Sequence, residues 1–105
     1  MQDDETFSAR SSDYRVIPST ADASDIVMSH ASVNYDRSGF VQDLNSVFPI
    51  DRLRELAEAK TIESIASSHY SFMGATEPGA LEKSAKNMIG MLKEDQANAV
   101  FLTPV

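Results

Sequence analysis

The sequence predicts an α/β fold: a three-layer-like sandwich with a mainly parallel sheet, which is an incomplete portion of a larger domain. Three observations lead to this prediction. Short β-rich runs and helical periods follow one another in the order strand, strand, helix, strand, helix, strand. Two of the runs are apolar almost throughout, which is typical of strands covered on both faces. The composition, 42% hydrophobic and 24% charged residues in a chain of 105, is that of a single globular domain.

The first half of the chain combines polar stretches with two predicted strands. Residues 1–13 are polar without a sustained period, and we expect a mobile arm there, followed by an α/β domain over 14–105 that is truncated at its C-terminal end. Residues 14–18 form a short β-rich run ended by proline, which predicts an edge strand. Residues 25–30 read as a nearly continuous apolar strand, and residues 31–45 as a long loop.

The second half contains both predicted helices. Apolar residues at helical spacing predict an amphipathic helix over 50–60, and the alternation that follows favours a strand ending at Gly74. Thr76 is expected to cap the next helix, whose apolar stripe extends over 81–92. Residues 97–103 form a further apolar run, and we expect a buried central strand there.

Composition and charge exclude several classes of function. A net charge of −7 argues against a nucleic-acid partner, because binding a phosphate backbone needs clustered Lys and Arg. The absence of cysteine excludes a disulfide, a thiolate metal site and a cysteine nucleophile within these residues. No apolar run is long enough to span a membrane, and the acidic start is unlike a signal peptide. We therefore expect a cytoplasmic protein without membrane contact.

Two groups of polar residues are candidates for chemistry. His30 and His69 could meet at one edge of the sheet as an acid or base, although either could equally be a structural histidine. Asn34, Asp36 and Arg37, with Asp43 and Asn45 further along the same loop, could hold an amino-acid-like ligand, with Arg37 gripping a carboxylate. Turns and surface ion pairs use the same residue types. The histidines and Asp36 lack the spacing typical of metal ligands, so no metal site is predicted.

Three segments resemble the selenoprotein B family of glycine, sarcosine, betaine and D-proline reductases. These are residues 45–56, which contain VFPIDRL, residues 69–74, which read HYSFMG, and residues 99–105, which read AVFLTPV. Their order and spacing also match, and the resemblance covers residues 26–105. Neither of the first two strings is by itself a catalytic signature.

The resemblance implies a catalytic nucleophile directly after Val105. In the family, the strand similar to residues 100–105 leads into a selenocysteine or, in some members, a cysteine. Thr103 would then help to position that nucleophile, and His30 and His69 would tune it or transfer a proton. Because selenocysteine is encoded by UGA, which is ordinarily read as stop, we expect the sequence to be interrupted at that codon. With neither selenocysteine nor cysteine, we expect these residues alone to be catalytically inert.

The resemblance also implies a reaction and partners. Family members cleave a C–N bond reductively, with a selenolate that is ionised at neutral pH, where an ordinary thiol is mostly protonated. This chain would carry no cofactor, since the family's pyruvoyl group belongs to a partner subunit, and a selenoprotein or thiol would act as reductant. The apolar final strand of residues 97–103 predicts that the chain forms homo-oligomers.

Two other functions remain open from the sequence. One is a natural non-catalytic binding or assembly module that keeps the scaffold and lacks the nucleophile. The other is an unrelated, self-sufficient enzyme that uses His30, His69 and Asp36.

Overall fold

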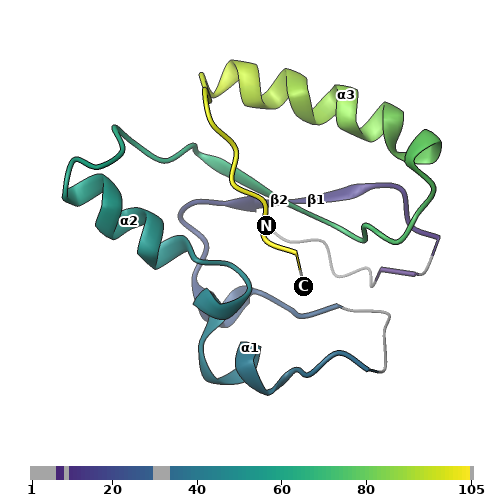
Figure 1. The fold of residues 1–105 in the computed structure, drawn as a ribbon, viewed down its shortest axis with the longest axis horizontal. Coiled ribbons are helices and arrows are strands. Elements are labelled where there is room, and N and C mark those ends of the chain that lie inside the picture. The colour runs from purple at the N-terminus through teal and green to yellow at the C-terminus, as the bar shows by residue number, and fades with distance from the viewer. Residues whose placement is uncertain (1–6, 9, 30–33, 105) are drawn as a thin grey trace. The chain divides into compact units, whose positions relative to one another are not determined.

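The computed structural model describes residues 7–8, 10–29 and 34–104, and the chain divides into two compact units. Unit 1 comprises Met1–Val33 and Ala66–Asn98, and unit 2 comprises Asn34–Ile65 and Ala99–Val105. Figure 1 shows the helices and strands along the chain. Within the described ranges, no helix combines the length and the apolar character needed to cross a membrane.

The sheet of unit 1 consists of two antiparallel strands, β1 (Tyr14–Pro18) and β2 (Ser68–Phe72). Tyr14 pairs with Phe72 at one end, and Ile17 pairs with His69. Because side chains alternate across a strand, Arg15 and Ile17 share one face, and both are buried. Both strands were predicted, and helices and strands together confirm an α/β composition. The predicted parallel sheet and three-layer sandwich are wrong.

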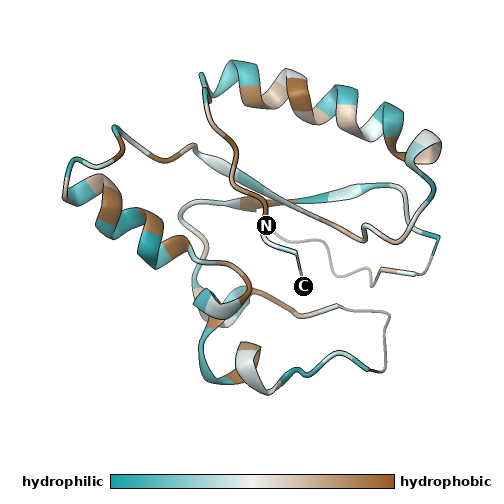
Figure 2. Ribbon diagram, in the orientation of Figure 1, coloured by the Kyte–Doolittle hydropathy of each residue, from teal (hydrophilic) through white to brown (hydrophobic). Residues whose placement is uncertain are grey.

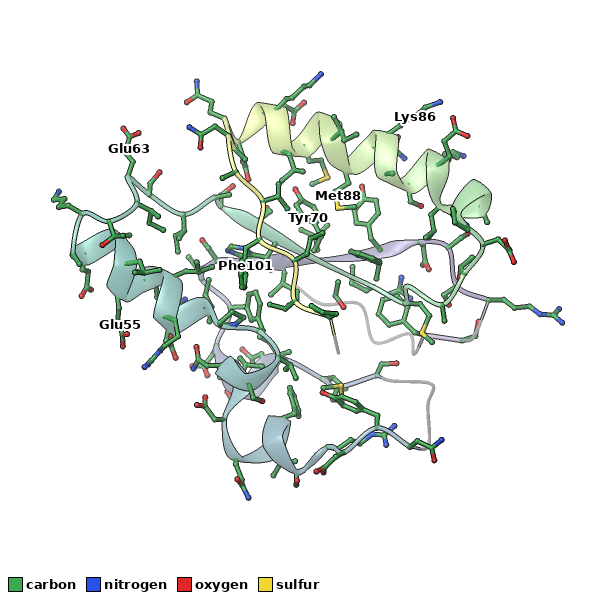
Figure 3. The ribbon with its side chains drawn as sticks, viewed as in Figure 1. Glu55, Glu63, Tyr70, Lys86, Met88 and Phe101 are labelled. Carbon is green, nitrogen blue, oxygen red and sulfur yellow. The ribbon has the colours of Figure 1, made fainter. Side chains whose placement is uncertain are left out.

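Helix α3 (Pro78–Glu94) packs against the sheet face that carries Tyr14. The Tyr14 hydroxyl donates to Met91 Sδ over 3.5 Å, and at the end of the helix Asp95 accepts from the backbone N–H of Ser68 over 3.2 Å. Figure 3 shows Met88 pointing from α3 toward the sheet. The helix was predicted, but Thr76 does not cap it. The Thr76 hydroxyl donates instead to the Ser11 carbonyl over 2.7 Å.

Unit 2 contains two α-helices, α1 (Ser38–Gln42) and α2 (Ile50–Glu58), with the 3₁₀ turn η2 (Leu44–Ser46) between them. Helix α2 confirms the predicted amphipathic helix, and Ile50 is its buried residue. Figure 2 shows apolar and polar residues alternating along its turns. The predicted loop over 31–45 is therefore partly helical in its described portion, residues 34–45.

Both longer helices end in the same way, with a residue in the left-handed region that is not glycine. Lys60 follows α2 with φ 61°, and Gln96 follows α3 with φ 58°. The next N–H in each case bonds back into the last turn, from Thr61 to Leu56 over 2.9 Å and from Ala97 to Leu92 over 2.9 Å. These bonds satisfy carbonyl groups that a helix end otherwise leaves without a partner.

Two predicted strands are absent from the described residues. In the run over 25–30, the 3₁₀ turn η1 (Ala23–Asp25) precedes irregular backbone at residues 26–29, and His30 lies outside the described residues. Residues 97–104 are irregular rather than a buried strand, and Phe101 is 69% exposed. The prediction of a parallel sheet depended on these two runs, because each was expected to be a strand covered on both faces, as strands of a parallel sheet are.

Candidate functional site

In unit 2, the segment that carries Thr103 is tied to the start of α2. The Thr103 hydroxyl donates to the carbonyl oxygen of Val47 over 3.1 Å. Val47 lies in the short connection between η2 and α2. The two ends of this bond belong to segments 45–56 and 99–105, which are far apart in sequence. The structure thus places Thr103 against the connection that leads into α2.

The Asn45 side chain fixes both ends of that connection. Its Oδ1 accepts from the backbone N–H of Asp51 over 2.9 Å, and its Nδ2 donates to Asp51 Oδ2 over 3.0 Å and to Asp43 Oδ1 over 3.0 Å. Pro49 occupies the N-cap position of α2 and provides no side-chain cap. Asn45 therefore satisfies one of the N–H groups that the first turn leaves open. We call the paired Asn45 and Asp51 the Asn45 clamp.

Hydrogen bonds keep the carboxylates of this region ionised at neutral pH. The bond from Asn45 and then that from Arg54, whose Nη1 lies 2.8 Å from Asp51 Oδ1, lower the pKa of Asp51 below its usual range. The bonds from the Asn45 side chain and backbone likewise lower the pKa of Asp43. Both carboxylates are exposed or half-exposed, so each is an acceptor that orients the Asn45 amide rather than a proton donor.

The predicted ligand loop is built from turn contacts. The Asp36 carboxylate accepts from the Ser38 hydroxyl over 2.6 Å and from its N–H over 2.9 Å, at the start of α1. These bonds lower the pKa of Asp36. Arg37 donates to the Tyr35 carbonyl over 3.4 Å, and Asn34 is exposed. The described contacts therefore match the turn chemistry that the sequence left open beside the ligand site.

In unit 1, His69 shares a sheet face with a buried arginine. Arg15 is 7% exposed, forms an ion pair with Asp13, and lies 4.6 Å above the ring of Phe7. The hydrogen bond from Arg15 lowers the pKa of Asp13. Sequence analysis did not single out Arg15, although the period of two in β1 places it beside buried Ile17. Whether His69 meets His30 lies outside the described residues.

The opposite face of the sheet contains a pair of tyrosines. The rings of Tyr14 and Tyr70 are 5.7 Å apart and cross at 74°. Burial, followed by the negative charge of Asp95, raises the pKa of Tyr70. Its hydroxyl therefore stays protonated at neutral pH and cannot act as a base there. Figure 3 shows Tyr70 in the region between the sheet and α3.

The described side chains are better suited to orienting neighbouring groups than to catalysing a reaction themselves. Within residues 7–8, 10–29 and 34–104, no three His, Asp or Glu side chains gather closely enough to hold a metal ion. Aspartates 36, 43 and 51 accept hydrogen bonds from neighbouring residues and have lowered pKa values. The arrangement of interest is thus the contact between Thr103 and Val47, supported by the Asn45 clamp.

Comparisons with known proteins agree with the segments quoted above. A family model described as glycine/sarcosine/betaine reductase selenoprotein B matches residues 6–105. The D-proline reductase subunit gamma of Acetoanaerobium sticklandii is 35% identical over 92 residues, which make up 86% of this chain. The same match covers 37% of that relative, so the chain spans well under half of its length. No solved structure matches the chain significantly.

Proposed function

Because the chain belongs to the glycine/sarcosine/betaine reductase selenoprotein B family, we propose that it forms part of a reductase subunit. The reaction is reductive cleavage of a C–N bond in a small amino-acid substrate, such as glycine, sarcosine, betaine or D-proline. The single observation that supports this most is the family match, which extends over residues 6–105 rather than over one short motif.

The nucleophile of the proposed reaction lies outside these residues, which contain no cysteine. By the family resemblance it is a selenocysteine or cysteine that directly follows the position of Val105. A selenolate attacks the α-carbon, a Se–C bond forms, and the amine leaves with the electron pair of the C–N bond. A thiol or selenol of a partner then attacks the selenium, the Se–C bond breaks, the α-carbon takes a proton, and a selenenyl sulfide or diselenide remains. The pyruvoyl group that the resemblance implies on a partner subunit would make the amine a better leaving group.

The part of the site contributed by these residues is a support for the nucleophile. The hydrogen bond of Thr103 to Val47 favours this role, because it holds the segment next to the proposed nucleophile against the start of α2. Loss of alignment by a fraction of an ångström is costly in a displacement reaction. The 105 residues by themselves are then inert, and the further candidates for support are His30, His69, Asn34, Asp36 and Arg37.

The test is C–N cleavage by the whole polypeptide that contains these residues, assembled with its pyruvoyl-containing partner subunit and supplied with a dithiol. Cleavage is read as free amine from glycine, sarcosine or betaine, and as the ring-opened amino acid from D-proline, whose nitrogen stays on the product. We expect cleavage of at least one of these substrates. The matched control replaces the selenocysteine or cysteine after position 105 with serine, which should abolish cleavage. An assembled complex that cleaves none of these substrates would contradict the proposal.

A second function, a non-catalytic assembly module, is favoured by one observation. Val100, Phe101 and Leu102 are 62%, 69% and 71% exposed, which is unusual for three consecutive apolar residues. In this alternative the segment binds another chain and no nucleophile follows it. Determining the coding sequence beyond position 105 distinguishes the two, because the reductase requires a selenocysteine or cysteine there.

A further inference from the structure

We propose that Asn45 is a positioning residue for the reaction above, acting through the Val47 carbonyl and the Thr103 hydroxyl. The inference rests on the proposed function, because it assumes that the residues next to Thr103 carry the nucleophile. It adds a residue that touches neither the substrate nor the nucleophile. Three hydrogen bonds carry the argument: the two between Asn45 and Asp51 in the Asn45 clamp, and the one from the Thr103 hydroxyl to the Val47 carbonyl.

The first step is that the Asn45 clamp closes the connection containing Val47. Asn45 bonds twice to Asp51, once to its backbone N–H and once to its carboxylate, with distances of 2.9 and 3.0 Å. Backbone bonds inside the closed segment add to this, from Phe48 N–H to the Leu44 carbonyl over 2.8 Å and from Ile50 N–H to the Phe48 carbonyl over 2.8 Å. With both ends and the interior bonded, the Val47 carbonyl has little freedom to turn.

The second step is that Thr103 depends on this carbonyl. Val100, Phe101 and Leu102 are more than 60% exposed in the described unit, so apolar packing contributes little to holding residues 99–104. The hydrogen bond from Thr103 to Val47 attaches this segment to the connection before α2 in the described part of unit 2. If the carbonyl rotates after the clamp is lost, the attachment is weakened although neither partner has been changed.

The experiment uses the whole polypeptide in its assembled complex, with four variants. Asn45→Ala removes the clamp, and Thr103→Val removes the hydroxyl while keeping the side-chain shape. Thr103→Ser retains the hydroxyl and serves as the conservative rescue. Asn87→Ala, an exposed asparagine on α3 in the other unit, is the matched control. The readouts are kcat, KM and the alkylation rate of the nucleophile against pH.

We expect Asn45→Ala and Thr103→Val to lower kcat by about three- to tenfold, which corresponds to one ordinary hydrogen bond, and to leave KM nearly unchanged. The serine and control variants should behave as wild type. An active enzyme in which Asn45→Ala leaves kcat unchanged would overturn the role of Asn45.

Failure of the proposed function gives a different result. If the wild-type complex cleaves none of the substrates, the proposed function fails. Should Asn45→Ala not fold, Asn45→Asp takes its place, because it keeps an acceptor for the Asp51 N–H and loses both donors. It also places a third carboxylate beside Asp43 and Asp51, so the same loss of kcat is expected. A wild-type kcat in that variant would likewise overturn the inference.

Discussion

Replacing Tyr70 with phenylalanine should stabilise the protein. The Tyr70 hydroxyl is buried and has no hydrogen-bond partner among the described residues. A buried hydroxyl without a partner costs about 1–3 kcal/mol, and phenylalanine removes this cost while keeping the ring. The crossed contact with Tyr14, at 5.7 Å, does not use the hydroxyl and is retained. We therefore expect Tyr70→Phe to raise the free energy of unfolding by about 1 kcal/mol at pH 7.

The effect should grow at alkaline pH, because burial raises the pKa of Tyr70. The folded state holds the phenol proton more tightly than the unfolded state, whose tyrosines titrate near pH 10. Stability from this group is thus fully present below about pH 10 and is lost as the pH rises toward the folded-state pKa. Phenylalanine cannot ionise, so the variant escapes this loss and its advantage over wild type widens above pH 10.

The measurement is guanidinium chloride unfolding at pH 7 and pH 10.5, followed by circular dichroism because the chain contains no tryptophan. The matched control is Tyr14→Phe, which loses a 3.5 Å bond to the weak acceptor Met91 Sδ. We expect that variant to be destabilised by about 0.5 kcal/mol at most. The reasoning is refuted if Tyr70→Phe is less stable than wild type at pH 7, since the hydroxyl then has a partner in solution.

Further predictions concern stability and association. Gly90→Ala should raise the unfolding free energy by about 0.5–1 kcal/mol in thermal melts, because glycine inside helix α3 costs stability. Gln96→Gly should raise it by a similar amount, because Gln96 has a φ of 58°, which glycine adopts without strain. Asp13→Asn should weaken folding at neutral pH, because it removes the ion pair between Asp13 and buried Arg15. Since the pKa of Asp13 is lowered, the wild-type advantage should shrink below about pH 4 in urea titrations. Phe101→Glu should reduce self-association in sedimentation velocity, since it puts a charge into an exposed apolar run; equal sedimentation of variant and wild type would argue against a homo-oligomer through that segment.

The sequence predicted the elements whose signals are local. Helices α2 and α3 follow from apolar spacing, and β1 ends at Pro18 as expected. The runs over 25–30 and 97–103 failed because an apolar segment becomes a strand only when another strand bonds to its edge. The residue types of a segment do not show whether another strand pairs with it. The parallel sheet was inferred from these runs, so it was lost with them.

Within the candidate site, Thr103 is the residue whose role was predicted. Thr103 was identified through the family resemblance, but its acceptor, the Val47 carbonyl, carries no side-chain signal in the sequence. Asn45 was noted as a polar residue of the long loop, but its capping role was not predicted, because the familiar capping positions lie immediately before a helix, where this chain has Pro49. A proline at the N-cap provides no side-chain acceptor, so the N–H groups of the first turn bond to water or to a more distant residue. Asn45 fills that role from the preceding turn.

The course of the chain through the two units limits how the proposed function can be tested. Unit 2 contains the segments at 45–56 and 99–105, whereas the HYSFMG segment lies in unit 1, partly in β2. Each unit is built from two separate stretches, so the chain passes from one unit to the other three times. No single cut isolates either unit, and removing residues 99–105 takes Thr103 away from unit 2 without touching α2. Point substitutions in the whole polypeptide are therefore the way to separate the support of the nucleophile from the stability of either unit.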